Sequence, residues 1–197
     1  MRRDSIAAVG ASTMSMKDLK THYIKEVLPA MKAKFGYRNT MAVPRIVKVV
    51  VNVGAGRLRD AKEHEEVQKY LGSITGQIPA RRPAKKAIAS FKIRQGQIVG
   101  YQVTLRGRRM YDFLTRFIVV ALPRTRDFWG INPDAFDMNG NLTVGVKEHI
   151  VFPEMIGEDY RLLFGLEVTI VTTAKNREEG VELLKLMGFP IRTKDKG

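Results

Sequence analysis

The residues best suited to chemistry in this 197-residue chain are cations gathered in one window. Between Val67 and Tyr111 there are ten lysine and arginine residues and no aspartate or glutamate. Six of these cations lie between Arg81 and Arg94, in a segment too irregular for a helical stripe, and Phe91 is among them. Ammonium and guanidinium groups neutralise phosphates and release counterions, while an aromatic ring stacks on a base or sugar. The window therefore predicts a polyanionic partner.

A second group of cations, Arg106, Arg108 and Arg109, comes just before a predicted helix. The helix dipole disfavours cations at an N-terminus, which points to an external anion there. A solvated basic hairpin is the simpler explanation of any charge run. We favour nucleic-acid binding over this explanation because the whole window lacks acidic residues and polar strand residues lie beside it.

Charge and composition exclude several other classes of protein. The formal net charge is +14 and the pI about 10.1, with 44% hydrophobic and 27% charged residues, which suits a folded core and an acidic partner. There is no cysteine, which excludes disulfides and thiolate zinc sites and fits the cytoplasm. The apolar stretch Phe117–Leu122 is far shorter than the ~20 residues needed to cross a bilayer. A membrane-surface protein would also need a basic amphipathic helix in place of this window.

An enzyme that uses a nucleotide or modifies RNA is the main alternative. Gly54-Ala-Gly56, after a predicted strand, begins like a dinucleotide-binding fingerprint. The third glycine is replaced by Arg59, and no ribose-binding carboxylate is found from Val67 to Tyr111. A tight turn between strand and helix explains the glycines better.

No catalytic or metal site is predicted elsewhere. His22, His64 and His149 are far apart and lack ligand spacing, so we interpret them as packing or surface residues. Ser73 and Ser90 have no neighbouring base to activate them. We therefore expect a protein that is not an enzyme and has no cofactor or metal.

Hydrophobic periodicity gives the elements that must position these residues. Helices are predicted at Met16–Phe35 (with a kink or break at Pro29), Asp60–Leu71, Met110–Leu122 and from Asn176 to Gly188; strands are predicted at Ile46–Val53, Gly76–Pro83, Ile98–Leu105 and Leu166–Thr173; Phe128–Asn141 is predicted to be loop. This order favours an α+β fold: a single domain with a mainly antiparallel sheet, helices packed on one face and a protruding basic loop. We expect a flexible N-terminal extension at residues 1–15, one domain at 16–191 and a short tail at 192–197.

Several collinear motifs resemble one known family. They are Ile74-Thr-Gly-Gln77, Lys85-Lys-Ala-Ile-Ala89, Phe91-Lys-Ile-Arg-Gln-Gly96, Val103-Thr-Leu-Arg-Gly107, Met110-Tyr-Asp-Phe-Leu114, Ala121-Leu-Pro-Arg-Thr-Arg-Asp-Phe128, Gly145-Val-Lys-Glu148, Phe152-Pro-Glu154 and Thr169-Ile-Val-Thr-Thr-Ala174. In order and spacing, over about residues 16 to 191, they resemble the bacterial large-subunit ribosomal protein number five family.

The resemblance implies a non-catalytic ribosomal protein that binds 5S rRNA and 23S rRNA in the central protuberance. It further implies contact with peptidyl-site tRNA through the basic loop, a bridge to small-subunit protein thirteen, and contacts with other central-protuberance proteins. Carried over residue by residue, the 5S rRNA contacts would be Asn52, Gln77, Thr104 and Arg106. Contacts with tRNA or phosphate would be made by Arg81, Arg82, Lys85, Lys86, Ser90, Phe91, Lys92 and Arg94, and further rRNA phosphate contacts by Arg108 and Arg109.

The sequence departs from the family pattern at several places, including the extra residues 1–15, the segment Gly56-Arg-Leu-Arg59 in place of a more acidic stretch, and two single positions. Ser90 stands where the family usually has glycine, which limits positive φ and close approach to RNA at the loop tip. Trp129 replaces a common arginine.

Overall fold

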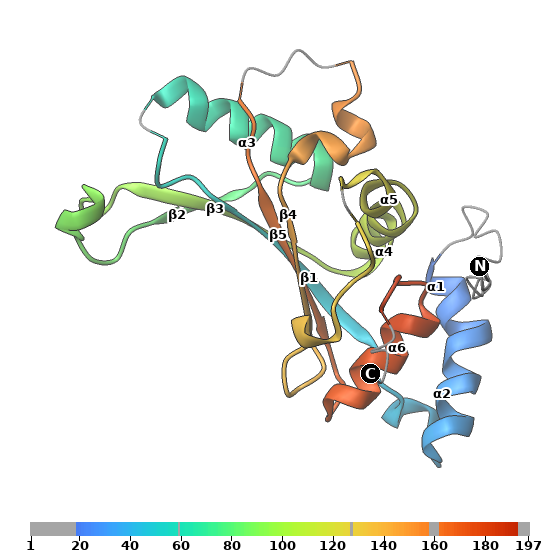
Figure 1. Cartoon of the computed structure of the whole chain (residues 1–197). Coiled ribbons are helices and arrows are strands. Elements are labelled where there is room, and N and C mark those ends of the chain that lie inside the picture. The colour runs from blue at the N-terminus through green and yellow to red at the C-terminus, as the bar shows by residue number, and fades with distance from the viewer. Residues whose placement is uncertain (1–18, 59, 127, 158–161, 193–197) are drawn as a thin grey trace, which may run out of the picture.

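The computed structural model describes residues 19–58, 60–126, 128–157 and 162–192. The strands are β1 (Ile46–Gly54), β2 (Ala80–Pro83), β3 (Ile98–Leu105), β4 (Leu142–Val146) and β5 (Leu166–Thr172). The helices are α1 (Leu19–His22), α2 (Leu28–Phe35), α3 (Ala61–Thr75), α4 (Gly107–Arg116), α5 (Leu122–Arg124) and α6 (Arg177–Leu186). All pairings in the five-stranded sheet, ordered β2-β3-β1-β5-β4, are antiparallel. Helices lie along one side of this sheet (Figure 1), which confirms the α+β prediction.

Alternation along the strands gives the sheet its two different faces. In β1 the side chains of Val49, Val51 and Val53 are buried, whereas Val50 is half-buried and Asn52 is exposed. Successive side chains of a strand point to opposite faces, so the buried valines share one face. This face packs against the helices, and the other is left to a ligand or to water.

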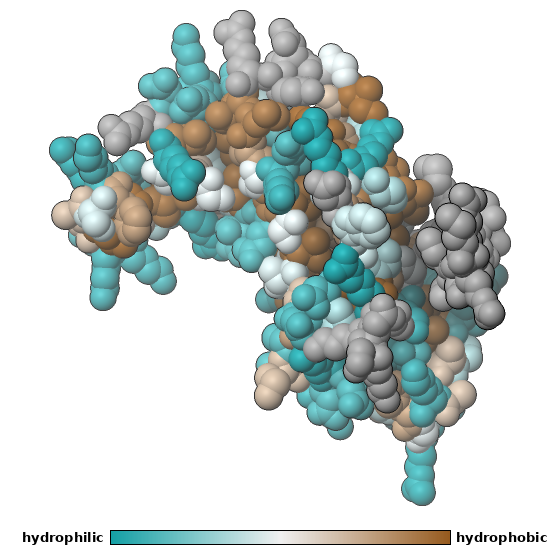
Figure 2. Space-filling view, in the orientation of Figure 1, coloured by the Kyte–Doolittle hydropathy of each residue, from teal (hydrophilic) through white to brown (hydrophobic). Residues whose placement is uncertain are grey.

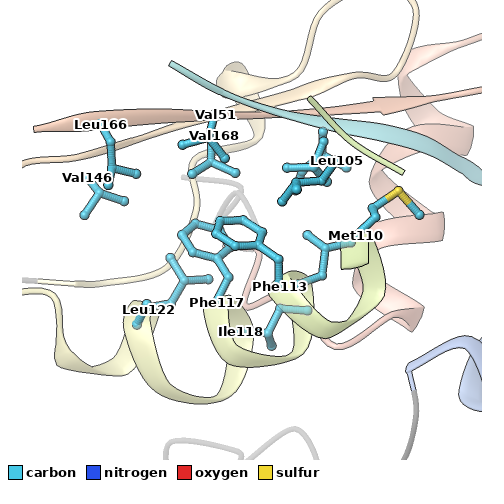
Figure 3. Close-up of a cluster of buried hydrophobic side chains, with 14 of the residues drawn as sticks. Val51, Leu105, Met110, Phe113, Phe117, Ile118, Leu122, Val146, Leu166 and Val168 are labelled. Atoms are coloured by element: carbon cyan, nitrogen blue, oxygen red, sulfur yellow. The ribbon is translucent and has the colours of Figure 1, made fainter. Parts of the chain in front are cut away.

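Aromatic side chains of α4 and of the turn that follows it fill the space under the sheet. Figure 3 shows Phe113 and Phe117 below Val51, Val168 and other strand residues. The rings of Phe113 and Phe117 stack with centroids 5.9 Å apart, and Phe152 stacks on both. All three phenylalanines are at most 1% exposed. The helices and the sheet therefore share one apolar core.

Two prolines lie inside helical segments and are accommodated in the same way. Each follows a π-helical turn, Tyr23–Val27 before Pro29 and Phe117–Ala121 before Pro123. A proline lacks the N–H group and its ring crowds the carbonyl four residues earlier. The wider π turn relieves that crowding. The kink or break expected at Pro29 thus takes the form of a π turn, and Met16, the expected start of this helix, lies outside the described residues.

Several predicted element boundaries were wrong. The helix predicted to end at Leu71 continues to Thr75 and is closed by Gly76 at φ 66°. The strand predicted to start at Gly76 therefore starts at Ala80. The helix predicted from Met110 begins at Gly107. Strand β4 was not predicted.

We expect Gly180→Ala to destabilise the protein although alanine favours helices. Gly180 lies in α6, where its Cα faces the loop that ends at Gly140. A Cβ atom at Gly180 would lie 2.5 Å from the Gly140 Cα, so backbone would have to move. Overpacking of this kind costs about 1–3 kcal/mol and outweighs a helix-propensity gain of about 1 kcal/mol. Urea denaturation of the variant measures the loss.

Gly72 in α3 gives the matched control. A Cβ there would lie 4.0 Å from the nearest atoms, the Gln77 carbonyl oxygen and Pro79 Cδ. Gly72→Ala should therefore raise the free energy of unfolding by up to about 1 kcal/mol. If both variants gained stability, the tight packing at Gly180 would be disproved.

Candidate nucleic-acid interface

The face of the sheet opposite the helices carries a row of amide and carboxylate side chains. In the strand register Asn52 of β1 lies opposite Gln102 of β3 and, on its other side, opposite Glu167 of β5. Directly opposed residues of antiparallel strands place their Cβ atoms about 5 Å apart on one face. Asn52 and Glu167 are exposed and Gln102 is half-buried. The row therefore offers both donors and acceptors to a ligand.

A neighbouring row is made mainly of threonines. Thr104 of β3 lies opposite Val50, Val50 opposite Thr169 of β5, and Thr169 opposite Thr143 of β4. The Thr143 and Thr169 hydroxyls are hydrogen-bonded at 3.2 Å. We call these two rows the open face.

The chemistry of the open face suits bases and sugars better than phosphates. Its polar side chains are short and neutral except for Glu167, whose carboxylate repels phosphate. Amides, hydroxyls and a carboxylate can instead bind 2′-hydroxyl groups and the edges of unstacked bases. The open face can thus read features that a cluster of cations cannot.

The predicted 5S rRNA contacts are only partly brought together. Asn52 and Thr104 lie on the open face, on adjacent strands. Gln77 is half-buried in the connection between α3 and β2. Since β2 runs antiparallel to β3, Gln77 lies toward the Thr104 end of that strand. Arg106 follows β3 directly and is exposed.

The open face includes polar residues that were not predicted as contacts. Gln102 alternates with Thr104 along β3, a pattern visible in the sequence. The alternation of β5 likewise indicates that Thr169 points to this face. Thr143 carries no such indication, because its strand was not recognised.

The segment between β2 and β3, residues 84–97, is called the basic loop below. Its two arms are joined by hydrogen bonds from the Ala84 N–H to the Gln97 carbonyl (2.8 Å) and between Ile88 and Ile93 in both directions (2.9 and 3.1 Å). A 3₁₀ turn, Ala89–Phe91, lies between these arms. In Figure 1 the basic loop lies beyond β2 and β3, at one end of the molecule.

The candidate contacts of the basic loop are all exposed. They are Lys85, Lys86, Ser90, Phe91, Lys92 and Arg94. Phe91 is 71% exposed, and Lys92 has a positive φ of 54°. Figure 2 shows hydrophilic side chains around a few apolar ones at this end of the molecule. An exposed ring among cations has the composition of a stacking platform for nucleic acid.

The two arginines of β2 point to different faces. Arg82 lies opposite Gly100, on the side of the open face, whereas Arg81 lies opposite the buried Tyr101. The Arg81 guanidinium donates to the Gln68 side chain of α3 at 3.4 Å. Burial raises the pKa of Tyr101, whose hydroxyl is within 3.2 Å of His64 Nδ1. These contacts fix the root of the β2–β3 hairpin to α3.

The arginines at the start of α4 remain available to an anion. Arg108 and Arg109 are both exposed. Arg108 forms a loose ion pair with Asp112, at 3.8 Å, with 95% of its side chain exposed. No side chain caps this helix start.

Sequence reasoning missed a further basic pocket. Its volume is about 460 Å³, and its lining includes Arg124, Arg126 and Lys147. These cations lie in two of the motifs that carry the family resemblance, Ala121–Phe128 and Gly145–Glu148. The sequence alone does not indicate that these two motifs are neighbours in the fold.

The histidines have the structural roles that were predicted. His22 contacts the Leu186 carbonyl oxygen at 2.9 Å, and His149 is buried against Phe164 with parallel rings 4.1 Å apart. Burial lowers the pKa of His149. Among residues 19–58, 60–126, 128–157 and 162–192, no three potential ligands form a metal-binding group. None of the helices within those ranges has the length and apolarity to cross a membrane.

Family comparisons cover most of the chain. Residues 39–94 match the model described as ribosomal protein L5, and residues 98–191 match the model for the C-terminus of the same ribosomal family. The chain is similar to large ribosomal subunit protein uL5 of Alkaliphilus oremlandii, with 51% identity over 89% of this chain and 98% of the relative. Its identity to uL5 of Halothermothrix orenii is also 51%, with the same coverage. For uL5 of Dictyoglomus turgidum the identity is 49% over 90% of this chain and 99% of the relative.

Proposed function

The chain belongs to the ribosomal protein L5 family of the large ribosomal subunit, and on that premise we propose that its open face binds 5S rRNA in the central protuberance. As a member of this family it is a structural component of the large subunit, not an enzyme, and works in the cytoplasm within the ribosome. The observation that carries the proposal is a sheet face of polar side chains that includes no cation and one carboxylate, Glu167, in a protein of net charge +14.

In this proposal Asn52, Gln77 and Thr104 make the specific contacts with 5S rRNA. Asn52 and Thr104 lie on adjacent strands of the open face, and Gln77 lies toward the same end of β3. Their groups are suited to 2′-hydroxyls and base edges. Arg106, at the border of the open face, contributes a phosphate contact.

We further propose that the basic loop contacts peptidyl-site tRNA. The exposed cations Lys85, Lys86 and Arg94 lie outside the open face and suit a second RNA. Arg108 and Arg109 at the start of α4 are assigned to further phosphates of rRNA. The bridge to small-subunit protein thirteen, and contacts with other proteins of the central protuberance, are supported by the sequence motifs alone.

Residues 16–191 are proposed to form one RNA-binding domain, with residues 1–15 as an extension and residues 192–197 as a tail. The two family models meet near residue 96, inside the basic loop. A single sheet and a single core nevertheless join both halves, since β1 pairs with β3 and with β5. The extension lies outside the described residues.

The double substitution Lys85→Gln, Lys86→Gln should separate the two RNA contacts. We expect the affinity of ribosomes for peptidyl-site tRNA to fall about tenfold, which corresponds to about 1.4 kcal/mol shared by two lost phosphate contacts. Affinity for 5S rRNA should change less than about threefold, because the open face is untouched. Filter binding with variant ribosomes and with isolated 5S rRNA measures the two affinities.

Salt dependence provides the accompanying control. If the wild-type chain neutralises about five phosphates of 5S rRNA, log affinity should fall against log salt with a slope of about −4. A flat response would contradict the electrostatic part of the proposal. A loss of 5S binding with intact tRNA binding would mean that the two surfaces are assigned in reverse.

A further inference from the structure

His149 is a buried imidazole at the place where the connection between β4 and β5 packs on α3. It begins the 3₁₀ turn His149–Val151, and it is 0% exposed. Figure 1 shows this part of the chain, in orange, beside the end of α3. Imidazole is the side chain whose ordinary pKa, about 6.5, lies closest to physiological pH. A change of its charge would therefore take place inside the core.

Two other parts of the chain contact this ring. The Phe164 ring, just before β5, lies parallel to it with centroids 4.1 Å apart, and the Tyr70 ring of α3 stacks on it at 5.4 Å. The His149 N–H donates to the Phe164 carbonyl at 3.0 Å, and the Phe164 N–H donates to His149 Nδ1 at 3.5 Å. The second hydrogen bond needs an unprotonated Nδ1. The neutral ring thus joins its turn to α3 and to the start of β5.

The carboxylates on this connection are engaged by other cations. Glu154 of the next turn pairs with Arg116 of α4. Glu148 lies among the cations that line the basic pocket. From α3, Tyr70 is the titratable group in contact with the imidazole, and the Lys69 ammonium lies 5.7 Å from the centre of the Tyr70 ring. The surroundings of the imidazole are therefore aromatic rings and backbone, with a cation beyond one of the rings.

Protonation of the ring is consequently unfavourable in the folded chain. Burial lowers the pKa of His149, and hydrogen bonding to the Phe164 backbone offsets only part of this effect. An exposed imidazole keeps its ordinary pKa, so a form of the protein in which this turn is open binds a proton more readily than the closed form. Acid therefore favours opening, increasingly so as the pH falls from about 6.5 through the pKa of the buried ring.

We propose that His149 is a pH-sensitive contact, which holds its turn on α3 while the ring is neutral and releases the turn at acidic pH. Ile150 and Val151 of this turn line the basic pocket together with Arg124 and Arg126. Release of the turn removes one wall of the basic pocket and separates its apolar residues from its cations. This conformational change is independent of the RNA contacts assigned to the open face.

Hydrogen exchange of the full chain tests the contact, with data at about pH 7.5 and about pH 5 corrected for the intrinsic pH dependence of exchange. Amides of the turn and of Phe164 should lose protection at the lower pH by about threefold or more. The limit is about 30-fold, set by the ordinary imidazole pKa of about 6.5. These amides should also be less protected than those of β1 and β3. Equal protection would mean that only unfolding of the whole chain exposes the turn, and would overturn local release.

His149→Gln provides the decisive comparison, because glutamine keeps hydrogen-bonding groups but does not titrate. In this variant the acid-dependent loss of protection at the turn should be less than about twofold. His64→Gln is the matched control: His64 is a half-buried histidine of α3 beside Tyr101, and its replacement should leave the loss as in wild type. An undiminished loss in His149→Gln would refute the proposal.

An NMR titration of the wild-type histidines gives a second measurement that does not depend on how well a variant folds. The His149 ring should titrate below the ordinary imidazole range, and its protonation should coincide with the loss of protection at the turn. Titration of His149 at or above its ordinary pKa would overturn the proposal. The proposed binding of 5S rRNA would be unaffected by either result.

Discussion

Replacing Asn52, Gln77 and Thr104 together with alanine should weaken binding to 5S rRNA about 100-fold. Each lost hydrogen bond between neutral groups contributes about 0.5–1.5 kcal/mol, and about 1.4 kcal/mol corresponds to a tenfold change in affinity. Asn52 is exposed and Gln77 and Thr104 are half-buried, so their replacement should leave folding largely unaffected. Titration of labelled 5S rRNA measures the loss, and thermal unfolding verifies the fold.

A second triple variant uses the same residue types elsewhere on the surface. Thr40, Gln95 and Asn139 are exposed, and replacing them with alanine should leave the affinity for 5S rRNA within about twofold of wild type. The salt slope should also be unchanged in the first triple variant, because it removes no phosphate contact. Equal losses in both variants would show that the open face is not the specific surface.

Phe113→Ala should produce the largest loss of stability, about 3–5 kcal/mol. Phe113 is fully buried and stacks on Phe117 and Phe152, with ring centroids 5.9 Å away in each case. Its removal leaves a cavity beneath the centre of the sheet, where surrounding rings are held by the strands above (Figure 3). Urea denaturation of the free protein gives the change in free energy of unfolding.

Phe91→Ala is the matched control for that loss. The Phe91 ring is 71% exposed, so its removal should change the free energy of unfolding by less than about 0.5 kcal/mol. If the two phenylalanine variants lost equal stability, the assignment of the core to α4 and the sheet would be wrong.

Much of the fold could be predicted because local patterns agreed with the tertiary structure. The alternation in β3 and the β-branched run in β1 identified both strands, and glycines after α2 and α6 marked helix ends. Strand β4 was missed since it is short and Gly145 interrupts its alternation, and its place depends on pairing with β5. Helix α3 was predicted to end at Leu71, whereas it continues through the buried Ile74 to Thr75.

The candidate site was less predictable than the fold. Basic residues were recognised from their charge alone, but the contacts of Arg81 with α3 depend on which face of β2 it occupies. The open face needs the register that sets Asn52 beside Gln102 and Glu167. The basic pocket needs the end of α5 to meet the segment that follows β4. No single stretch of sequence indicates which residues, distant along the chain, become neighbours in the fold.

Strand β2 affects the tendency of the free protein to self-associate before it binds RNA. It forms one edge of the sheet, and all four of its residues are exposed. An uncovered edge is a template for self-association through backbone pairing. Here Pro83 offers no N–H group, and Arg81 and Arg82 would confront identical charges on a second copy. These features disfavour the pairing of two free copies through this edge before the protein binds RNA.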